Sequence, residues 1–403
     1  MPTPLQQKVH DNWKKFLSEY TFDGKIGEGA YGVVRKGHKK NQPKKTVAIK
    51  QFKFQAPNPQ NHSEGIPITI CREVNILREL NDDNILKCKE VVIDPHSNAL
   101  IMVFPYCEYD LEKMLMAHRE RKDKPHMSDT LVKNIMYQLL KGMEYLHRNW
   151  VMHRDLKPAN ILIEKGVVKL ADFGLARIYQ SPHKTLGQDG PVVTIWYRSP
   201  ELLLGSKHYT PSVDMWSVGC IFNELLMTKA MFRGEELKGE SNPFQYKQLE
   251  KIFSIMGTPT LEDWSTMKDC PHYDKLRDWR KYDYRLPEVT RIPDNSRAFD
   301  LLRRLLIYDP DKRITAEEAL KHDYFTELPH PQTDNVFRGN SFQYAEHQIE
   351  TKYGGAQQDQ QHHSKSRSQH GDGRKYYQQG GGGVKRSHQG GGHQEHPHKR
   401  QKR

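Results

Sequence analysis

The residues most able to do chemistry lie in two short runs. Residues 153–160 read HRDLKPAN, and a DFG triplet begins twelve residues after Asn160, at Asp172. Asp155 can accept the proton of an attacking hydroxyl group, and Lys157 can neutralise a transferring phosphoryl group. Asn160 and Asp172 carry the hard oxygen atoms that magnesium prefers. Together these residue types and spacings indicate phosphoryl transfer.

A glycine-rich run stands near the start of the chain. Residues 27–34 read GEGAYGVV, which has the GxGxxG spacing that dinucleotide-binding folds share. In those folds the turn opens a helix, whereas here Val33 and Val34 begin a β-branched run, so we expect a hairpin lying over phosphates. Residues 47–50, VAIK, then predict a buried strand whose Lys50 reaches the α- and β-phosphates.

A lysine held in such a cleft needs a carboxylate to fix its ammonium group. The first predicted helix of the sheet-forming region offers Glu73, and Glu79 is the competing candidate. We favour Glu73, because Leu77, one turn further on, would face inward and because of the family resemblance described below.

The elements that position these residues differ between the two halves of the chain. Residues 22–104 contain short alternating runs rich in Val, Ile and Lys, with one helical stretch at 68–80, which predicts a small, mainly antiparallel sheet with one helix. From Leu111 onward long helices are predicted: residues 131–146 keep one apolar stripe, and residues 213–226 are apolar nearly all round. The fold class is therefore α+β with two lobes.

Both ends of the chain carry further signals. Residues 4–20 have apolar side chains at helical spacing, which predicts an amphipathic helix that packs on its own domain or docks on a partner. Residues 351–403 hold 11 of the 62 Lys and Arg but only 3 of the 50 Asp and Glu. Because this segment is also dominated by Gln, His, Gly and Ser, we expect a disordered basic tail. Its Lys385-Arg386 and the cluster at 399–403 fit a two-part nuclear-import signal.

Composition excludes several other classes. The five cysteines have no CxxC spacing, which argues against a disulfide framework and against a zinc site. No apolar stretch reaches the ~18 residues that a membrane span needs, and the N-terminus lacks the apolar segment of a signal peptide. We expect a soluble intracellular chain with no membrane partner.

The motifs taken together are similar to the signature set of protein kinases, over residues 22–325 or about three quarters of the chain. Ser199-Pro200-Glu201 completes that set. Lys157 at its place in HRDLKPAN resembles serine/threonine kinases. The Trp-Tyr-Arg run at 196–198 and the segment at 308–316 resemble cyclin-dependent kinases.

A finer resemblance points to one branch of that family. The run Cys71-Arg72-Glu73 is similar to the cyclin-contacting helix, and Trp150, Ser206–Thr210 and Ser241–Phe244 resemble most closely the branch that pairs with cyclin C in the transcriptional Mediator complex. The resemblance implies a nuclear enzyme that uses ATP and Mg²⁺ to phosphorylate proteins at Ser/Thr-Pro sites. Its implied partners are a C-type cyclin and subunits of the Mediator kinase module.

The resemblance also implies an organisation and a set of site residues. The segments are an N-terminal helix at 1–21, a kinase domain at 22–325 with N-lobe 22–104, hinge 105–108 and C-lobe 109–325, an extension at 326–350 and the tail at 351–403. The catalytic residues are Asp155, Lys157, Lys50, Glu73 and Thr194, and the metal ligands are Asn160 and Asp172. The nucleotide is expected to contact Ile26, Gly27, Glu28, Gly29, Ala30, Tyr31, Gly32, Val33, Val34, Ala48, Lys50, Phe104, Tyr106, Cys107 and Leu162.

Two positions depart from the usual family pattern without removing its function. Phe104 matches the gatekeeper, and Pro105 replaces an acidic hinge residue but keeps the carbonyl that the contact uses. Ser199 replaces an alanine, and Glu201 is still expected to pair with Arg313.

The activation segment, 172–201, contains the most informative departure. Asp189 stands where many cyclin-dependent kinases carry a threonine whose phosphate bridges three arginines, matched here by Arg72, Arg154 and Arg177. Because a carboxylate offers less charge and fewer acceptor oxygens than a phosphate, we predict activity without phosphorylation at this site, with a partner ordering the segment. The alternative is that Asp189 is only a solvated loop acid.

The resemblance also implies roles for two residues just before the Trp-Tyr-Arg run, one in substrate preference and one in the catalytic cluster. Val193 implies a preference for proline after the phosphorylated residue, because its backbone leaves no acceptor for a substrate amide and proline has no such amide. Thr194 is expected to bond Asp155 and Lys157.

Three other functions stay open at this point. A catalytically weak kinase-fold scaffold is disfavoured because all the phosphoryl-transfer residues are present. A mitogen-activated kinase is disfavoured because residues 175–195 lack the Thr-x-Tyr of that class. Direct nucleic-acid binding by the basic tail is compatible with each reading.

Overall fold

The computed structural model describes residues 3–29, 32–54, 66, 68–121, 123, 126–179, 195–208, 210–235 and 244–347. All of these belong to one compact unit, Met1–Lys352. The expected disordered tail and its nuclear-import signal lie outside the described residues. None of the helices in the described ranges combines the length and the apolar character that crossing a membrane requires.

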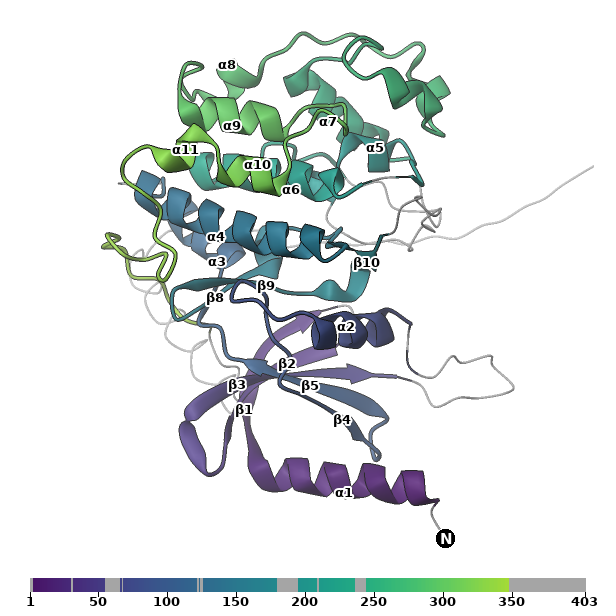
Figure 1. Cartoon of the computed structure of the whole chain (residues 1–403), viewed down its shortest axis with the longest axis vertical. Coiled ribbons are helices and arrows are strands. Elements are labelled where there is room, and N and C mark those ends of the chain that lie inside the picture. Colours follow the sequence, from purple (N-terminus) through teal and green to yellow (C-terminus); the bar gives the residue numbers. More distant parts are fainter. Residues whose placement is uncertain are drawn as a thin grey trace, which may run out of the picture. The chain divides into compact units, whose positions relative to one another are not determined.

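The chain begins with the predicted amphipathic helix, α1 (Pro4–Glu19). Thr3 caps it, because its hydroxyl accepts a hydrogen bond from the backbone of Gln6 in a reciprocal capping box. Phe16 is fully buried and packs with Val47 and Ile49 of the neighbouring sheet, so the helix does pack on its own domain. Leu5 near the start of the helix and Leu17 near its end are exposed. Figure 1 shows α1 running alongside the sheet, next to β4.

The first lobe is a five-stranded antiparallel sheet in the order β1-β2-β3-β5-β4. Its strands are β1 (Tyr20–Gly29), β2 (Gly32–Lys39), β3 (Gln42–Lys53), β4 (Glu90–Asp94) and β5 (Ala99–Pro105). The helix α2 (Ile68–Glu79) lies on the opposite side of the sheet from α1, as Figure 1 shows. The alternating runs predicted the strands around the glycine-rich hairpin and the hinge, but they did not predict β4.

The second lobe is mainly helical. Its helices are α3 (Leu111–Arg119), α4 (Asp129–Arg148), α5 (Pro200–Leu203), α6 (Ser212–Met227), α7 (Tyr246–Met256), α8 (Leu286–Thr290), α9 (Arg297–Leu305), α10 (Ala316–Leu320) and α11 (Asp323–Thr326). Its short strands are β6 (Tyr109–Asp110), β7 (Val151–Met152), β8 (Ile161–Glu164), β9 (Val167–Leu170) and β10 (Arg177–Ile178), of which β8 and β9 lie between α4 and the five-stranded sheet in Figure 1. The central helix α6 is buried over nearly its whole length, as its all-round apolar sequence predicts. The two-lobed α+β fold is thus confirmed.

After α11 the chain continues without helices or strands as residues 327–347, which we call the strap. Lys133 and Asn134 of α4 fix its first half, because Lys133 Nζ donates to Glu327 O at 3.0 Å and Asn134 Nδ2 donates to Val336 O at 3.1 Å. The Val336 side chain is fully buried. The strap ends beside the hinge, where the backbone nitrogen of His347 lies 3.4 Å from Glu108 O.

Candidate active site

Three charged side chains from separate elements meet between the lobes. Lys50 Nζ on β3 lies 2.9 Å from Glu73 Oε1 on α2 and 3.6 Å from Asp172 Oδ1 in the DFG turn. The expected partner of Lys50 is therefore present. Glu73 is only 3 % exposed, whereas the alternative partner, Glu79, lies on the exposed side of α2. The ion pair links the sheet to its helix.

The protonation states of this cluster follow from burial and charge. Burial lowers the pKa of Lys50, but the nearby charges of Asp172 and Glu73 outweigh that effect and raise it above its ordinary value. Burial raises the pKa of Asp172, and the charges of Lys50 and Lys157 more than compensate, so it lies below the ordinary value. Lys50 and Asp172 are therefore both ionised at neutral pH. Burial raises the pKa of Glu73, and Lys50 only partly opposes this.

The loop at residues 153–160, which we call the catalytic loop, holds a second cluster. Lys157 Nζ lies 2.8 Å from Asp155 Oδ2, and Asn160 Nδ2 donates to Asp155 O at 2.8 Å and to its Oδ2 at 3.2 Å. Asp155 is 8 % exposed and lines the cleft. These bonds fix the Asp155 carboxylate in one orientation, and the short helix Pro158–Asn160 places Asn160 beside it.

A buried carboxylate from α6 holds the catalytic loop in place. Asp214 Oδ2 accepts from the backbone nitrogen of His153 at 2.9 Å, and its Oδ1 accepts from that of Arg154 at 2.7 Å. Oδ2 also lies 3.0 Å from His147 Nε2. Arg154 adopts a positive φ of 67°, an uncommon conformation that these bonds support. Sequence reasoning missed Asp214, although an acid in the first turn of a largely apolar helix was a signal, because a buried carboxylate needs donors.

These groups face a cleft of about 580 Å³ between the sheet and the helical lobe. Of the residues expected to contact a nucleotide, it is lined by Ile26, Gly27, Glu28, Gly32, Val34, Ala48, Lys50, Phe104, Tyr106, Cys107 and Leu162. Its apolar walls at the hinge end and its charged groups at the other end suit a flat base joined to phosphates. Five residues that no motif had indicated also line it: Leu86, Ala171, Asp110, Lys113 and His347.

The prediction for Val33 is not supported by the geometry. Val33 pairs with Glu28 and Gln51 in the sheet, and it is not among the residues lining the cleft. Side chains alternate between the two faces of a strand, and Val34 takes the cleft face. Gly29 pairs with Gly32 where the hairpin turns.

Gly32 has a steric reason to be glycine. A Cβ atom there would lie 2.0 Å from the backbone oxygen of Gln51 on β3, a distance at which the strands would have to move apart. The third glycine of the motif therefore permits the close approach of β2 and β3 beside Lys50.

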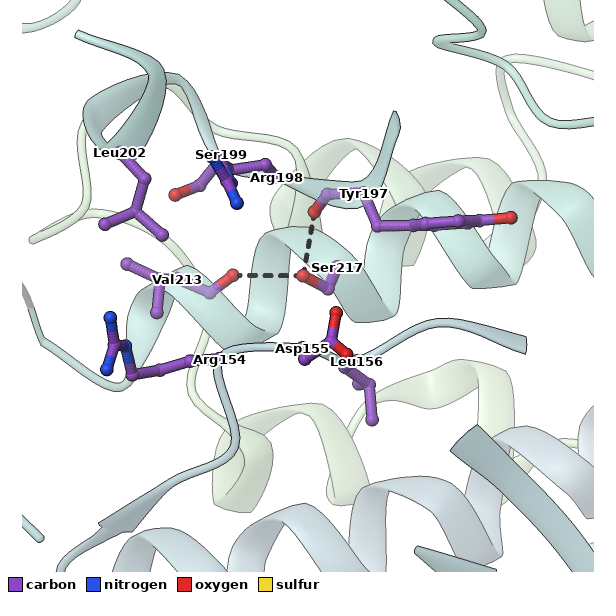
Figure 2. A pocket seen from close by; sticks show the side chains of 9 residues that line it. All are labelled: Arg154, Asp155, Leu156, Tyr197, Arg198, Ser199, Leu202, Val213 and Ser217. Atoms are coloured by element: carbon purple, nitrogen blue, oxygen red, sulfur yellow. Dashed lines mark hydrogen bonds between the residues drawn. The ribbon is translucent and has the colours of Figure 1, made fainter. Parts of the chain in front are cut away.

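On the side away from the cleft, Asp155 faces the end of the activation segment. Figure 2 shows Arg154, Asp155 and Tyr197 around a very small cavity, with Ser217 of α6 between Tyr197 and Val213. Ser217 Oγ donates to Tyr197 O at 2.8 Å, which ties this segment to the central helix (Figure 2).

The expected pair of Glu201 and Arg313 is present nearby. The two residues form a buried bidentate ion pair, with Arg313 Nη1 and Nη2 at 2.8 and 3.1 Å from the two carboxylate oxygens. The pair links α5 to the loop that precedes α10.

The arginines of the predicted regulatory site come from three elements. Arg72 lies on α2, Arg154 lies in the catalytic loop, and Arg177 begins β10. Arg177 pairs with Met152 in the β7–β10 ladder, two residues before Arg154, and Arg154 Nη1 donates to Leu175 O at 3.2 Å. The remaining predicted site residues lie outside the described residues. They are Ala30, Tyr31, Asp189, Thr194 and Val193, the last of which is expected to set substrate preference.

The donor atoms at the inner end of the cleft fit magnesium. Asn160 uses its amide nitrogen in both of its side-chain hydrogen bonds, so the amide oxygen is the atom it can offer to a cation. Asp172 is ionised and is turned into the cleft by a positive φ of 67°. In the described part of the chain no cluster of three His, Cys, Asp or Glu side chains could hold a metal. Two protein oxygens therefore suit an ion that keeps waters and phosphate oxygens as its other ligands.

Known proteins share this architecture and sequence. A model of the protein kinase domain matches residues 20–325. The chain is 48 % identical over 320 residues to "Probable cyclin-dependent kinase 8" of Dictyostelium discoideum, covering 78 % of this chain and 82 % of that protein. It is 48 % identical over 327 residues to "Cyclin-dependent kinase E-1" of Arabidopsis thaliana, covering 79 % and 68 %.

A fungal protein and a solved structure extend the comparison. "Serine/threonine-protein kinase SSN3" of Yarrowia lipolytica is 43 % identical over 345 residues, covering 83 % of this chain and 84 % of that protein. The crystal structure of the yeast RNA Pol II CTD kinase CTDK-1 complex contains a chain that superposes with a TM-score of 0.66 at 35 % identity, covering 78 % of this chain and 95 % of that one.

Proposed function

The chain belongs to the protein kinase family and, within it, to the cyclin-dependent serine/threonine kinases, and we propose that it transfers the γ-phosphoryl group of ATP to Ser or Thr residues followed by proline. One observation carries the proposal. Asp155, Lys157, Asn160, Lys50 and Asp172 line a single cleft that also has apolar walls beside the hinge. This is the arrangement that positioning and charge neutralisation of a nucleotide require.

The roles of the side chains follow from their atoms. Asp155 orients the substrate hydroxyl and accepts its proton, and its bonds to Lys157 and Asn160 hold the carboxylate ready to do so. Lys50, fixed by Glu73, binds the α- and β-phosphates, and Lys157 neutralises charge on the group being transferred. Asn160 and Asp172 would hold magnesium, whose chemistry there is to neutralise charge between the β- and γ-phosphates.

The substrate preference and the mode of activation rest on residues of the activation segment. Val193 supports a preference for proline after the phosphorylated residue, and Thr194 is proposed to align Asp155 with Lys157. Activity without phosphorylation at the position of Asp189 is also proposed. Because a carboxylate offers Arg72, Arg154 and Arg177 less charge than a phosphate would, a partner is proposed to order the segment.

We further propose that the protein acts in the nucleus as the kinase of a Mediator kinase module, with a C-type cyclin. The support is the similarity of Trp150, Ser206–Thr210 and Ser241–Phe244 to that branch of the family, and the similarity of the run ending at Glu73 to a cyclin-contacting helix. One structural neighbour is named as a kinase of the RNA polymerase II tail, which agrees with a role in transcription. The exposed Leu5 and Leu17 on α1 offer a surface for such a partner.

The test is phosphate transfer to a matched pair of peptides. The full chain, purified with and without a C-type cyclin, is incubated with Mg-ATP and a Ser-Pro peptide or its Ser-Ala counterpart. We expect incorporation into the Ser-Pro peptide that rises strongly with cyclin and falls to background in Asp155→Asn. Absence of incorporation with the cyclin bound would support a scaffold instead, and equal use of the two peptides would remove the proline preference alone.

A further inference from the structure

The last residues of the strap stand at the mouth of the cleft. His347 lines the cleft together with Tyr106 of the hinge and Asp110 just beyond it. Its ring meets that of Tyr106 edge to face, with centroids 6.2 Å apart. The hinge end of the cleft is therefore bounded by a residue that follows Phe104 by more than two hundred positions in the sequence.

The imidazole of His347 is held in one tautomer. Lys113 Nζ lies 2.7 Å from His347 Nδ1, and Asp110 Oδ2 lies 3.6 Å from the same nitrogen. An ammonium group can only donate, so Nδ1 accepts and the hydrogen of the neutral ring is on Nε2. Burial and then the charge of Lys113 keep the pKa of His347 below its ordinary value, which agrees with a neutral ring. In the described part of the chain no residue hydrogen-bonds to Nε2, so the Nε2–H group remains available as a donor to a ligand.

The strap is anchored along its length, so the position of His347 is part of the fold. Asn134 accepts from the backbone of Gln332 at 2.8 Å and donates to Val336 O, which seats the strap on α4. Near the other end, Tyr344 packs against Tyr109, and its hydroxyl lies 2.8 Å from His118 Nε2 on α3. These contacts tie the strap to the helical lobe on both sides of its midpoint.

We propose that the strap is a wall of the nucleotide site and that His347 donates its Nε2–H to the base or sugar end of the bound nucleotide. The proposal rests on the proposed function, which places the phosphates at Lys50 and Asp172 and therefore the base and sugar beside Tyr106 and Asp110. The protein kinase model ends at residue 325, so family membership assigns no role to this segment.

The experiment measures nucleotide binding directly and then turnover. Calorimetry with a non-hydrolysable ATP analogue and magnesium, and separately with ADP, is performed on the full chain bound to its cyclin. The variants are His347→Ala, His347→Gln, which keeps a donor near the place of Nε2, and His330→Ala. His330 is a matched control, because it is an exposed histidine of the same strap.

We expect His347→Ala to lower the affinity for both the ATP analogue and ADP by about three- to tenfold, which is the effect of losing one hydrogen bond. Because the loss concerns the base and sugar end, it should be equal for the analogue and ADP. His347→Gln should recover most of the affinity, and His330→Ala should match the wild type. In turnover the KM for ATP should rise by the same factor as the affinity falls while kcat stays nearly constant, as expected for uniform binding.

The outcomes distinguish failure of the proposed function from failure of the proposed role of His347. A wild-type protein that binds no nucleotide overturns the proposed function and this proposal with it. A wild-type protein that binds nucleotide, together with a His347→Ala variant of equal affinity, overturns the role of the strap alone. A His347→Gln variant as weak as His347→Ala overturns the assignment of the Nε2 donor. Melting temperatures within one degree of the wild type establish that the variants are folded.

Discussion

Lys50 and Glu73 join the sheet to its helix through an ion pair of 2.9 Å, and Glu73 is almost completely buried. The pair places the ammonium group within reach of Asp172. It therefore sets the position of the group that binds phosphates, although Glu73 itself need not touch the nucleotide.

Removing the lysine should make stability depend on pH. In Lys50→Met, the buried Glu73 remains beside the like charge of Asp172, and burial and that neighbouring charge already raise the pKa of Glu73. When folding raises the pKa of a carboxyl group, that group contributes its full stabilisation of the folded protein at pH values below its ordinary pKa of 4.5. The contribution is lost as the pH rises through the pKa of the folded state. Relative to the wild type, the free energy of unfolding of the variant should thus fall by about 1 to 2 kcal/mol between pH 5 and pH 8.

Chemical denaturation of both proteins at pH 5, 6, 7 and 8 measures this difference. The double variant Lys50→Met/Glu73→Gln has no ionisable group at position 73, so its stability relative to the wild type should change much less with pH. Parallel pH profiles for wild type and Lys50→Met would show that Glu73 does not titrate in the variant.

Replacing the carboxylate of the catalytic loop should abolish turnover without abolishing nucleotide binding. Asp155→Asn keeps the size of the side chain but cannot accept the proton, so kcat should fall by about 10²- to 10⁴-fold. The dissociation constant for ADP should change by less than about threefold, because Lys50 and the hinge bind the nucleotide. Asp278→Asn, at an exposed position, serves as the control and should leave kcat unchanged.

The buried pair of Glu201 and Arg313 should matter far more for stability than a surface pair of the same kind. Arg313→Ala leaves a carboxylate that is 2 % exposed without its partner and should lower the free energy of unfolding by about 3 to 5 kcal/mol. Lys321→Ala breaks the exposed pair with Glu317 and should cost less than about 1 kcal/mol. Urea denaturation compares the two, and equal losses would contradict the argument from burial.

Substitutions of a buried and an exposed residue of α1 should distinguish its effect on stability from its effect on partner binding. Phe16→Ala removes a fully buried ring and should destabilise the protein by about 3 to 5 kcal/mol. Leu17 is 41 % exposed, so Leu17→Lys should change stability by less than about 0.5 kcal/mol. If α1 binds the cyclin, Leu17→Lys should weaken that complex in a calorimetric titration, and unchanged affinity would restrict α1 to packing on its own domain.

The aspartate of the activation segment should be nearly dispensable once a partner is bound. Because a carboxylate makes fewer charge-assisted hydrogen bonds than a phosphate, Asp189→Ala in the cyclin complex should lower kcat/KM by less than about threefold. Asp189→Asn is the matched variant that keeps the size and removes only the charge. A loss of more than tenfold in both would mean that the carboxylate itself orders the segment.

Local patterns were sufficient for much of this architecture. The helices α1 and α2 and the buried α6 are predictable from apolar periodicity, and the inward-facing Leu77 favours Glu73 over Glu79 as the partner of Lys50. These features are set by residues close in sequence or by motifs of fixed spacing.

Features that depend on distant contacts were not predictable in the same way. Strand β4 is only five residues long and its apolar residues do not alternate with polar ones, so it is defined by its pairing with β5. Asp214 lies about sixty residues from the backbone groups that it binds. The position of His347 depends on anchoring by Asn134 on α4, a contact that leaves no local signal in the sequence.

A practical consequence follows from where the strap lies in the chain. A recombinant fragment trimmed to the boundaries of the matched domain, 20–325, would keep every motif residue and still lack one side of the cleft. Inhibitor screens on such a fragment would favour compounds that extend past the hinge into space that the whole protein fills with an imidazole. Selectivity measured on the shortened protein would then not carry over to the enzyme in the cell.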